Sequence, residues 1–428
     1  MRGDAMKRLL LIGAWLLLSA FGPAPRIFDP LTAPGAPPPP PGPCTLLVFM
    51  DGTSNNPATN TNVYKLFTAV VADRTKTGAR DTAAFYIEGV GTGLRFIGAA
   101  TGWGLSYRVR QAHAWLMQTW RPDDRIVIFG FSRGAFSARA LAGMLEYAGL
   151  PAEPVTDRRQ AQAMADALFA AVKQDGAPAA QRRESVLETL KRNHFPPLKP
   201  HVPVAFMGLW DTVEAMGNPL AGRNPYDLPN ANYGDQLCNV AKAAHALSAD
   251  DNRNRSYRPV LLTGAHLLAD CPDAGDIDAR VSEVWFTGAH SDVGGKETKK
   301  YAGWKLGGVA LNWMLAEAAP LQLFGDITPF PQDPLAISGN GQAAFSDLKA
   351  MSRTLAIQQR IVDGLYLAGY IAVHQSVIDN LKARQRQPYE FDWAATFPKC
   401  FDRTGPTAIF REQPGCRIRR VNTPPAQP

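Results

Sequence analysis

The chain has 428 residues, which is enough for one large α/β domain with insertions or for two domains. Hydrophobic residues make up 46% and charged residues 19%, as in an ordinary globular enzyme. No Lys/Arg-rich run with interleaved aromatic residues occurs, which argues against nucleic-acid binding. The net charge of +7 fits either an anionic partner such as a phospholipid surface or a mildly basic solvated surface.

The N-terminal residues have the pattern of an export signal. Lys7 and Arg8 precede an apolar run, residues 9–21, which has the length of a signal-peptide core and is short for a membrane-spanning helix. Residues 1–21 are therefore predicted to be a signal peptide or, if cleavage fails, a signal anchor. The protein is expected in the cell envelope of a bacterium, either periplasmic or anchored in the inner membrane and facing the periplasm.

Residues 22–43 are rich in proline, with the run Pro-Gly-Ala-Pro-Pro-Pro-Pro-Pro-Gly-Pro at 34–43. Such a segment is extended and semi-rigid. We predict a tether that holds the following domain away from a membrane or from the cleaved end. An inert disordered N-terminus is the alternative.

The five cysteines show no Cys-x-x-Cys spacing, so a structural zinc site is not supported. In an oxidising compartment, the first disulfide expected is Cys400–Cys416, which would close a short C-terminal loop. The second is Cys238–Cys271. We expect no metal and no other cofactor, because the sequence offers no convincing set of ligands.

From residue 44 onward, apolar runs of strand length alternate with helical patterns, which predicts an α/β fold. The expected architecture is α/β-hydrolase-like, a mostly parallel, doubly wound sheet with helical insertions. Residues 44–320 should form the main domain, with a helical insertion or lid near 151–199, and residues 321–428 a C-terminal extension packed on it. Strands are predicted at 45–50, 83–88, 125–129, 202–209, 259–262 and 281–287, and helices at 106–119, 132–147, 234–247 and 304–319.

The segment Gly130-Phe131-Ser132-Arg133-Gly134 lies between a predicted strand and a predicted helix. In this setting Gly-x-Ser-x-Gly forms a nucleophile elbow, a sharp turn that exposes the serine hydroxyl and needs glycines on both sides. The N-terminus of the following helix directs its dipole and free N–H groups at a developing oxyanion. Ser132 is therefore the predicted nucleophile of a serine hydrolase. A structural glycine turn is the alternative.

The base should be a histidine after Ser132, with the acid between the two. His290 is preferred, because it ends a predicted strand and enters a glycine-flanked loop where an imidazole can reach the elbow. The other candidates are His194, His201, His245, His266 and His374. Asp211, at the end of the strand 202–209, is the predicted acid, with helix capping as its alternative role.

Three further aspartates lie close to the predicted base and acid. Asp250 and Asp251 are secondary candidates for the acid. Asp292 is only two residues from His290 and is expected to brace the loop that carries it.

An oxyanion hole needs two hydrogen-bond donors. One is predicted to be the backbone N–H of Arg133, and the other should come from the loop Asp51-Gly52-Thr53 after the first strand. Gly52 lets the backbone come close, and Asp51 can hold the loop by accepting N–H bonds. The alternative is an ordinary Asp-Gly turn.

Four segments resemble the bacterial α/β-hydrolase family that includes the type VI secretion phospholipase effectors. They occur in the expected order and cover roughly residues 44–320. The resemblance implies a Ser132–Asp211–His290 triad, a phospholipase A or related lipid esterase activity, and positions for Gly52 and Asn55 near the oxyanion loop. The segments are Phe49-Met-Asp-Gly-Thr-Ser-Asn55, Gly130-Phe-Ser-Arg-Gly-Ala135, Gly208-Leu-Trp-Asp-Thr-Val213 and Trp285-Phe-Thr-Gly-Ala-His-Ser-Asp-Val-Gly-Gly295.

The expected function is that of a serine esterase that hydrolyses lipid esters through an acyl-enzyme. The alternatives are a non-lipid ester, thioester or peptide substrate, or a catalytically silent, tethered binding protein on the same scaffold. The expected partners are an ester substrate and a membrane surface. Because effectors delivered by an injection machine need no export signal, the predicted signal favours a resident envelope hydrolase over an effector.

Overall fold

The computed structural model describes residues 24–30, 42–89, 103–174, 176–214, 233–251, 259–262, 265–273, 275–297, 304–322, 324–325, 327–336, 369–383, 391–404 and 407–423. The predicted signal and most of the predicted tether lie outside these ranges. Within them, no helix is both long enough and apolar enough to cross a membrane.

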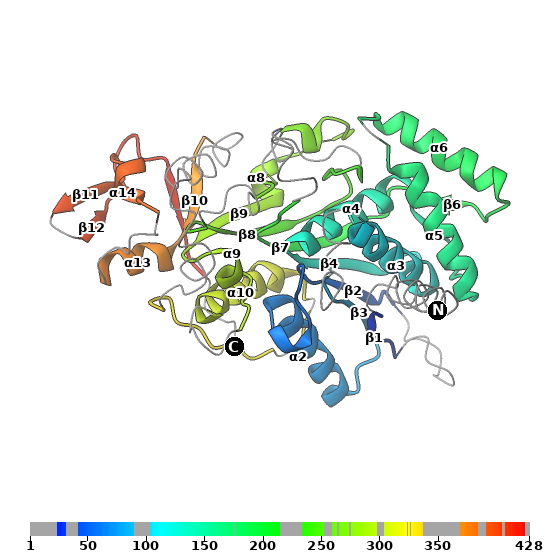
Figure 1. The fold of residues 1–428 in the computed structure, drawn as a ribbon, viewed down its shortest axis with the longest axis horizontal. Coiled ribbons are helices and arrows are strands. Elements are labelled where there is room, and N and C mark those ends of the chain that lie inside the picture. Colours follow the sequence, from blue (N-terminus) through cyan, green and yellow to red (C-terminus); the bar gives the residue numbers. More distant parts are fainter. Residues whose placement is uncertain are drawn as a thin grey trace, which may run out of the picture.

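A mostly parallel sheet forms the centre of the described structure (Figure 1). Every neighbouring pair is parallel except β1 and β3, which are antiparallel. In spatial order its nine strands are β1 (Arg26–Phe28), β3 (Thr82–Ile87), β2 (Thr45–Met50), β4 (Arg125–Phe131), β7 (Val204–Trp210), β8 (Ala243–Ser248), β9 (Val281–Phe286), β10 (Ile371–His374) and β13 (Ile418–Val421). This is the α/β-hydrolase-like, doubly wound architecture expected from the sequence.

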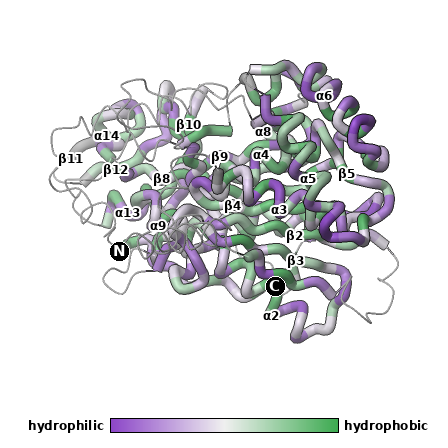
Figure 2. Tube along the Cα trace, turned by 45° about the vertical axis from the view of Figure 1, so that its right-hand side comes forward, coloured by the Kyte–Doolittle hydropathy of each residue, from purple (hydrophilic) through white to green (hydrophobic). Residues whose placement is uncertain are grey.

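Helices cover both faces of the sheet, which explains why its strands are continuous apolar runs. In β2, Leu46 and Val48 pack into the core beneath α3 to α6, whereas Leu47 and Phe49 pack into the core beneath α2 and α10. Figure 2 shows the strands as mainly hydrophobic and the outer helix α6 as largely hydrophilic. The helices are α2 (Asn62–Thr77), α3 (Trp103–Thr119), α4 (Arg133–Tyr147), α5 (Arg158–Val172), α6 (Ala179–Arg192), α8 (Ile277–Arg280), α9 (His290–Val293), α10 (Trp304–Ala318), α13 (Gln375–Ala383) and α14 (Trp393–Thr396).

The predicted insertion near 151–199 consists of α5 and α6, flanked by a small pair of strands, β5 (Leu150–Pro151) and β6 (Leu198–Lys199). Met164 and Leu168 of α5 are buried in the same core as α3 and α4. These two helices therefore form an outer layer on one face of the sheet.

The C-terminal region continues the central sheet through β10 and β13. Beyond them, α13, α14 and the hairpin of β11 (Phe401–Thr404) and β12 (Thr407–Phe410) surround a separate core that includes Trp285 of β9. Figure 1 shows this group at the opposite end of the molecule from α5 and α6. Within the range predicted as a tether, Arg26–Phe28 form the edge strand β1.

The helix predicted over 234–247 is wrong, because residues 243–248 form strand β8. This strand lies between β7 and β9 and is buried along its whole length. A strand covered on both faces shows no polar alternation, and its sequence Ala-Ala-His-Ala-Leu-Ser has the alanines of a helix. Of the short strand predicted at 259–262, only a single bridge between Pro259 and Val213 is present.

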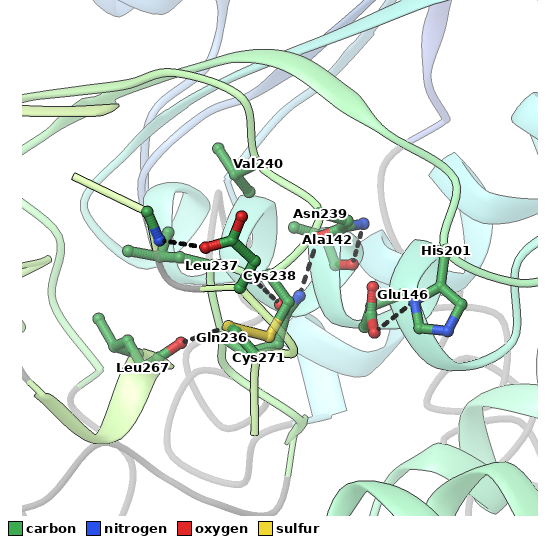
Figure 3. The surroundings of a disulfide bond; sticks show 12 residues. Ala142, Glu146, His201, Gln236, Leu237, Cys238, Asn239, Val240, Leu267 and Cys271 are labelled. Atoms are coloured by element: carbon green, nitrogen blue, oxygen red, sulfur yellow. Dashed lines mark hydrogen bonds and ion pairs between the residues drawn. A yellow bond between two sulfur atoms is a disulfide. The ribbon is translucent and has the colours of Figure 1, made fainter. Parts of the chain in front are cut away.

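Both predicted disulfides, Cys400–Cys416 and Cys238–Cys271, are formed, and Cys44 is a buried free thiol. Figure 3 shows Cys238–Cys271 beside the end of α4. There the Asn239 amide donates to the carbonyl of Ala142 at 3.1 Å. This disulfide joins the segment just before β8, which contains Cys238, to the segment between β8 and β9, which contains Cys271.

Candidate active site

The parallel strands bring their carboxyl ends to one edge of the sheet, and the predicted site residues follow five of these ends. They come after β2, β4, β7, β8 and β9. Residues far apart in sequence therefore meet at this edge.

Ser132 occupies the turn between β4 and α4, with φ 58° and ψ −128°. A positive φ is costly for serine and persists only where the surroundings enforce it. The glycines around it allow close packing: a Cβ on Gly130 would lie 2.5 Å from Cα of Ala135, and one on Gly134 would lie 2.1 Å from the carbonyl oxygen of Met50. Ser132 thus has the backbone geometry of the predicted nucleophile elbow.

The three side chains predicted as a triad form one hydrogen-bonded series. Nε2 of His290 lies 2.8 Å from Oγ of Ser132, and Nδ1 lies 2.6 Å from Oδ2 of Asp211. All three residues are buried, and the ring of Phe131 packs on the imidazole at 4.7 Å between centroids. With Nδ1–H donating to Asp211, Nε2 is left as the acceptor for the serine hydroxyl.

Ser248 was not predicted and is a close partner of Asp211. Its backbone N–H donates to Oδ1 at 3.0 Å, and its hydroxyl donates to Oδ2 at 2.9 Å. Together the two bonds fix the orientation of the carboxylate. No motif surrounds Ser248, so the only signal would have been its position at the end of a strand that sequence reasoning missed.

The other predicted aspartates hold the histidine loop. Oδ2 of Asp251 accepts the backbone N–H of His290 at 3.0 Å, and Oδ2 of Asp250 accepts that of Gly288 at 2.6 Å. Oδ2 of Asp292 accepts the N–H of Ala289 at 2.9 Å, which is the bracing geometry expected for it. None of these bonds joins an aspartate to the His290 ring.

The loop after β2 is organised around the buried carboxylate of Asp51. Oδ1 accepts the N–H of Gly52 at 2.7 Å, and Oδ2 accepts the hydroxyls of Thr61 at 2.8 Å and Tyr86 at 2.9 Å. Burial raises the pKa of Asp51 to about 6, although these hydrogen bonds oppose the rise. The loop is therefore tied down as predicted, and the Gly52 N–H is engaged in doing so.

Gly52, Thr53 and Asn55 lie next to the elbow. A Cβ on Gly52 would be 2.9 Å from Cβ of Ser132 and 2.8 Å from Nδ2 of Asn55, so any other residue here would displace one of these two side chains. Asn55 is buried, with its Oδ1 unpaired, and the hydroxyl of Thr53 is likewise buried without a partner within the described chain. Among the described residues, no hydrogen-bond partner therefore reaches either of these two oxygens at this edge of the site.

Arg108 of α3 is a second residue that sequence reasoning missed. Its guanidinium is fully buried, donating from Nη1 to the carbonyl oxygen of Asp51 at 2.5 Å and from Nη2 to that of Arg133 at 3.2 Å. Burial, together with the charge of Arg133, lowers its pKa to about 9. One side chain therefore links the two backbone segments predicted to form the oxyanion hole.

The position between Ser132 and Asp211 is occupied by His290, and the other candidate histidines have different partners. His245 bonds to Glu283 through Nδ1 at 2.9 Å and accepts the N–H of Thr212 at Nε2. His374 bonds to two hydroxyls, and His201 pairs with Glu146. His194 follows the end of α6, and the side chain of His266 lies outside the described residues. In the described part of the chain, no group of three or more His, Cys, Asp or Glu residues could hold a metal ion.

Three features define the α/β-hydrolase class. They are a mostly parallel sheet with helices on both faces, a strand–turn–helix elbow at Ser132, and the chain order Ser, Asp, His. Within that class the chain belongs to a family whose model is described as "T6SS, Phospholipase effector Tle1-like, catalytic domain". The match covers residues 45–317.

Individual relatives are more distant. An uncharacterised protein of Saccharomyces cerevisiae, YEL023C, is 27% identical over 196 residues, which is 40% of this chain and 27% of the yeast protein. A crystal structure of an uncharacterised Pseudomonas aeruginosa protein is 18% identical, covering 74% of this chain and 50% of the other, with a TM-score of 0.38. A Tle1 effector bound to the VgrG spike of the type 6 secretion system is 21% identical, covering 61% and 52%, with a TM-score of 0.33.

The chain thus spans about half the length of these two solved structures and about a quarter of the yeast protein. Both TM-scores are below 0.5, so these two likenesses add nothing to the family assignment.

Proposed function

We propose that this protein is a serine esterase that hydrolyses lipid ester bonds, with phospholipase A-type activity. The observation that carries the proposal is the buried series Ser132–His290–Asp211, with contacts of 2.8 Å and 2.6 Å, in a chain of a phospholipase effector family. A Ser–His–Asp series of this kind can cleave an ester without a cofactor.

In the proposed first step, Oγ of Ser132 attacks the ester carbonyl carbon while its proton passes to Nε2 of His290. The carbonyl π electrons move to oxygen, and the tetrahedral oxyanion accepts hydrogen bonds from Arg133 N–H and from the loop after β2. Collapse breaks the carbon–oxygen bond, and His290 returns the proton to the departing alcohol. For a phospholipid this alcohol is the lysophospholipid.

The acyl-enzyme is then hydrolysed by the same groups. His290 takes a proton from water, the water oxygen attacks the acyl carbon, and Ser132 leaves with the proton restored. The products are one fatty acid and one lysophospholipid for each phospholipid and water consumed. Asp211, held by Ser248, stabilises the imidazolium in both steps.

A substrate panel tests the class of ester. Purified protein is incubated with phospholipid vesicles, p-nitrophenyl butyrate, an acyl thioester and a peptide ester, and the products are identified by mass spectrometry. The proposal predicts release of fatty acid and lysophospholipid, and His290→Ala should lower turnover by about a thousandfold or more. Turnover of only the thioester or the peptide ester would assign the site to another substrate, and no turnover of any would favour a binding protein.

The proposed setting is the bacterial cell envelope, with the protein periplasmic or held at the inner membrane. The disulfides Cys238–Cys271 and Cys400–Cys416 support an oxidising compartment. The basic net charge of +7 supports contact with an anionic lipid surface. Fractionation of the native host cell, with protease accessibility from the periplasmic side, tests this location and separates a resident enzyme from a delivered effector.

A further inference from the structure

The oxyanion hole of the proposed esterase needs a second donor besides Arg133 N–H, and the backbone donor expected for it is already in use. Gly52 N–H donates at 2.7 Å to the carboxylate of Asp51, a bond buried within the loop. That carboxylate is in turn held by Thr61 and Tyr86. Turning the Gly52 N–H toward a substrate would break a tightly supported interaction.

The side-chain amide of Asn55 lies where that donor is needed. The point at which a Cβ on Gly52 would stand is 2.8 Å from Nδ2 of Asn55 and 2.9 Å from Cβ of Ser132. The amide, the nucleophile and the ring of Phe131, whose Cδ1 lies 3.1 Å from the same point, therefore border the space that a side chain at Gly52 would fill. The absence of a side chain at Gly52 is what permits this approach.

The backbone around Asn55 is fixed in a way that sets the position of its amide. Its N–H donates to the carbonyl of Gly52 at 3.0 Å, and its carbonyl accepts from Gly89 at 2.9 Å. The tight turn from Gly52 to Asn55 passes through Ser54 at a φ of 58°, an uncommon conformation for serine. The chain thus bends back so that Asn55 returns to the edge of the elbow.

Oδ1 of the Asn55 amide is buried without a hydrogen-bond partner in the part of the chain that the structure describes, and the residue as a whole is only 3% exposed. A buried polar atom without a partner costs about 1–3 kcal/mol, and such an atom beside a nucleophile is a candidate for a functional role. Asn56, next in sequence, contrasts with it, because its amide caps the short helix at Pro57–Thr59.

We propose that Nδ2 of Asn55 is the second oxyanion donor, acting with Arg133 N–H on the tetrahedral intermediate. This inference rests on the esterase activity proposed above. A donor held in place before the reaction gains most when the carbonyl oxygen becomes an anion, so its effect falls on kcat and not on KM.

The test compares Asn55→Ala with the matched control Asn56→Ala, using p-nitrophenyl butyrate and phospholipid vesicles. Because Oδ1 of Asn55 has no partner in the described fold, Asn55→Ala should not lower the free energy of unfolding, while kcat should fall by about 100- to 1000-fold at nearly unchanged KM. Asn56→Ala should show the opposite, losing a helix cap worth about 1 kcal/mol while keeping kcat.

A trifluoromethyl alkyl ketone provides a second readout, since it forms a tetrahedral hemiketal oxyanion with the serine. Its inhibition constant should rise in Asn55→Ala by about the factor lost from kcat/KM, whereas binding of a non-hydrolysable ether phospholipid should not change. Asn55→Asp, which removes the donor and adds a negative charge, should be at least as impaired as Asn55→Ala.

Three outcomes would overturn the inference while leaving the esterase intact. They are a kcat within fivefold of wild type in Asn55→Ala, a loss confined to KM, or a large loss in Thr53→Val with none in Asn55→Ala, which would make the Thr53 hydroxyl the donor. Absence of ester hydrolysis by the wild-type protein would instead refute the proposed function.

Discussion

Arg108 offers a direct test of how the two halves of the site are held together. Its guanidinium donates to the carbonyl oxygens of Asp51 and Arg133 at 2.5 Å and 3.2 Å. Replacing it with methionine keeps the apolar stem of the side chain and removes both donors. Lysine restores the charge, but a single ammonium group lacks the planar fork that reaches two carbonyls at once.

The expected loss follows from these contacts. Each hydrogen bond from a charged donor contributes about 1.5–3 kcal/mol, with the longer one at the low end. Part of this is offset because methionine avoids the cost of burying a charge, a cost seen in the lowered pKa of Arg108. We therefore expect Arg108→Met to lower the free energy of unfolding by about 2–4 kcal/mol. Loosening of both backbone segments should also reduce kcat by about tenfold to a hundredfold.

Urea unfolding and steady-state hydrolysis of p-nitrophenyl butyrate measure the two effects. Arg110→Met, in the same helix, is the matched control, because Arg110 is partly exposed and pairs with Asp166 at 3.0 Å. Such a surface pair contributes about 0–1 kcal/mol, so this variant should remain stable and active. If Arg108→Met stays within about 0.5 kcal/mol and twofold in kcat of wild type, the reasoning about Arg108 is refuted.

Three further perturbations separate the roles of other residues. Asp211→Asn should lower kcat by about ten-thousandfold with little change in folding, because an amide cannot hold the required tautomer of His290; activity within tenfold of wild type would remove Asp211 as the acid. Because the pKa of Asp51 is raised to about 6, the folded protein retains a proton that the unfolded chain loses above about pH 4. Urea titrations should therefore show the stability of wild type relative to Asp51→Asn decreasing from pH 4 to pH 6, and a rise would contradict the assignment. Replacing both Cys400 and Cys416 with alanine opens a loop with a sequence separation of 16 and should lower the free energy of unfolding by about 3 kcal/mol. A decrease of less than about 0.5 kcal/mol would show that this disulfide does not stabilise the fold.

The sequence was most informative where local chemistry and position coincide. The contact between Ser132, Asp211 and His290 could be predicted because each follows a strand and each is the residue type that its proposed role requires. In a parallel sheet those strand ends share one edge, so placement on strands was enough to predict proximity. The elbow glycines carried a further signal, since few other turns need two of them around a serine.

Residues that act through long-range packing could not be predicted in the same way. Ser248 was missed because β8, the strand that it ends, was predicted as a helix, which is the common ambiguity of a short apolar run buried on both faces. Arg108 looks like any polar position on a helix until the fold buries it beneath two loops. Gly52 was predicted as a donor to the oxyanion. The structure shows that its N–H donates to Asp51 instead, a local contact that the sequence pattern does not reveal.

The C-terminal strands illustrate the limit for topology. β10 and β13 are four residues each. β10 pairs with β9 and β13 pairs with β10, although both lie far from β9 in sequence. Strands of that length carry little periodic signal, and their pairing depends on a sheet edge assembled by the rest of the chain.

The central claim is that Ser132 is an activated nucleophile. Its most direct test is covalent labelling of the folded wild-type protein with a fluorophosphonate, followed by peptide mass spectrometry to locate the adduct. The account predicts one adduct, on Ser132, that is abolished in Ser132→Ala and strongly slowed in His290→Ala. A folded wild-type protein that carries no label on Ser132, or carries it on another serine, would contradict the account.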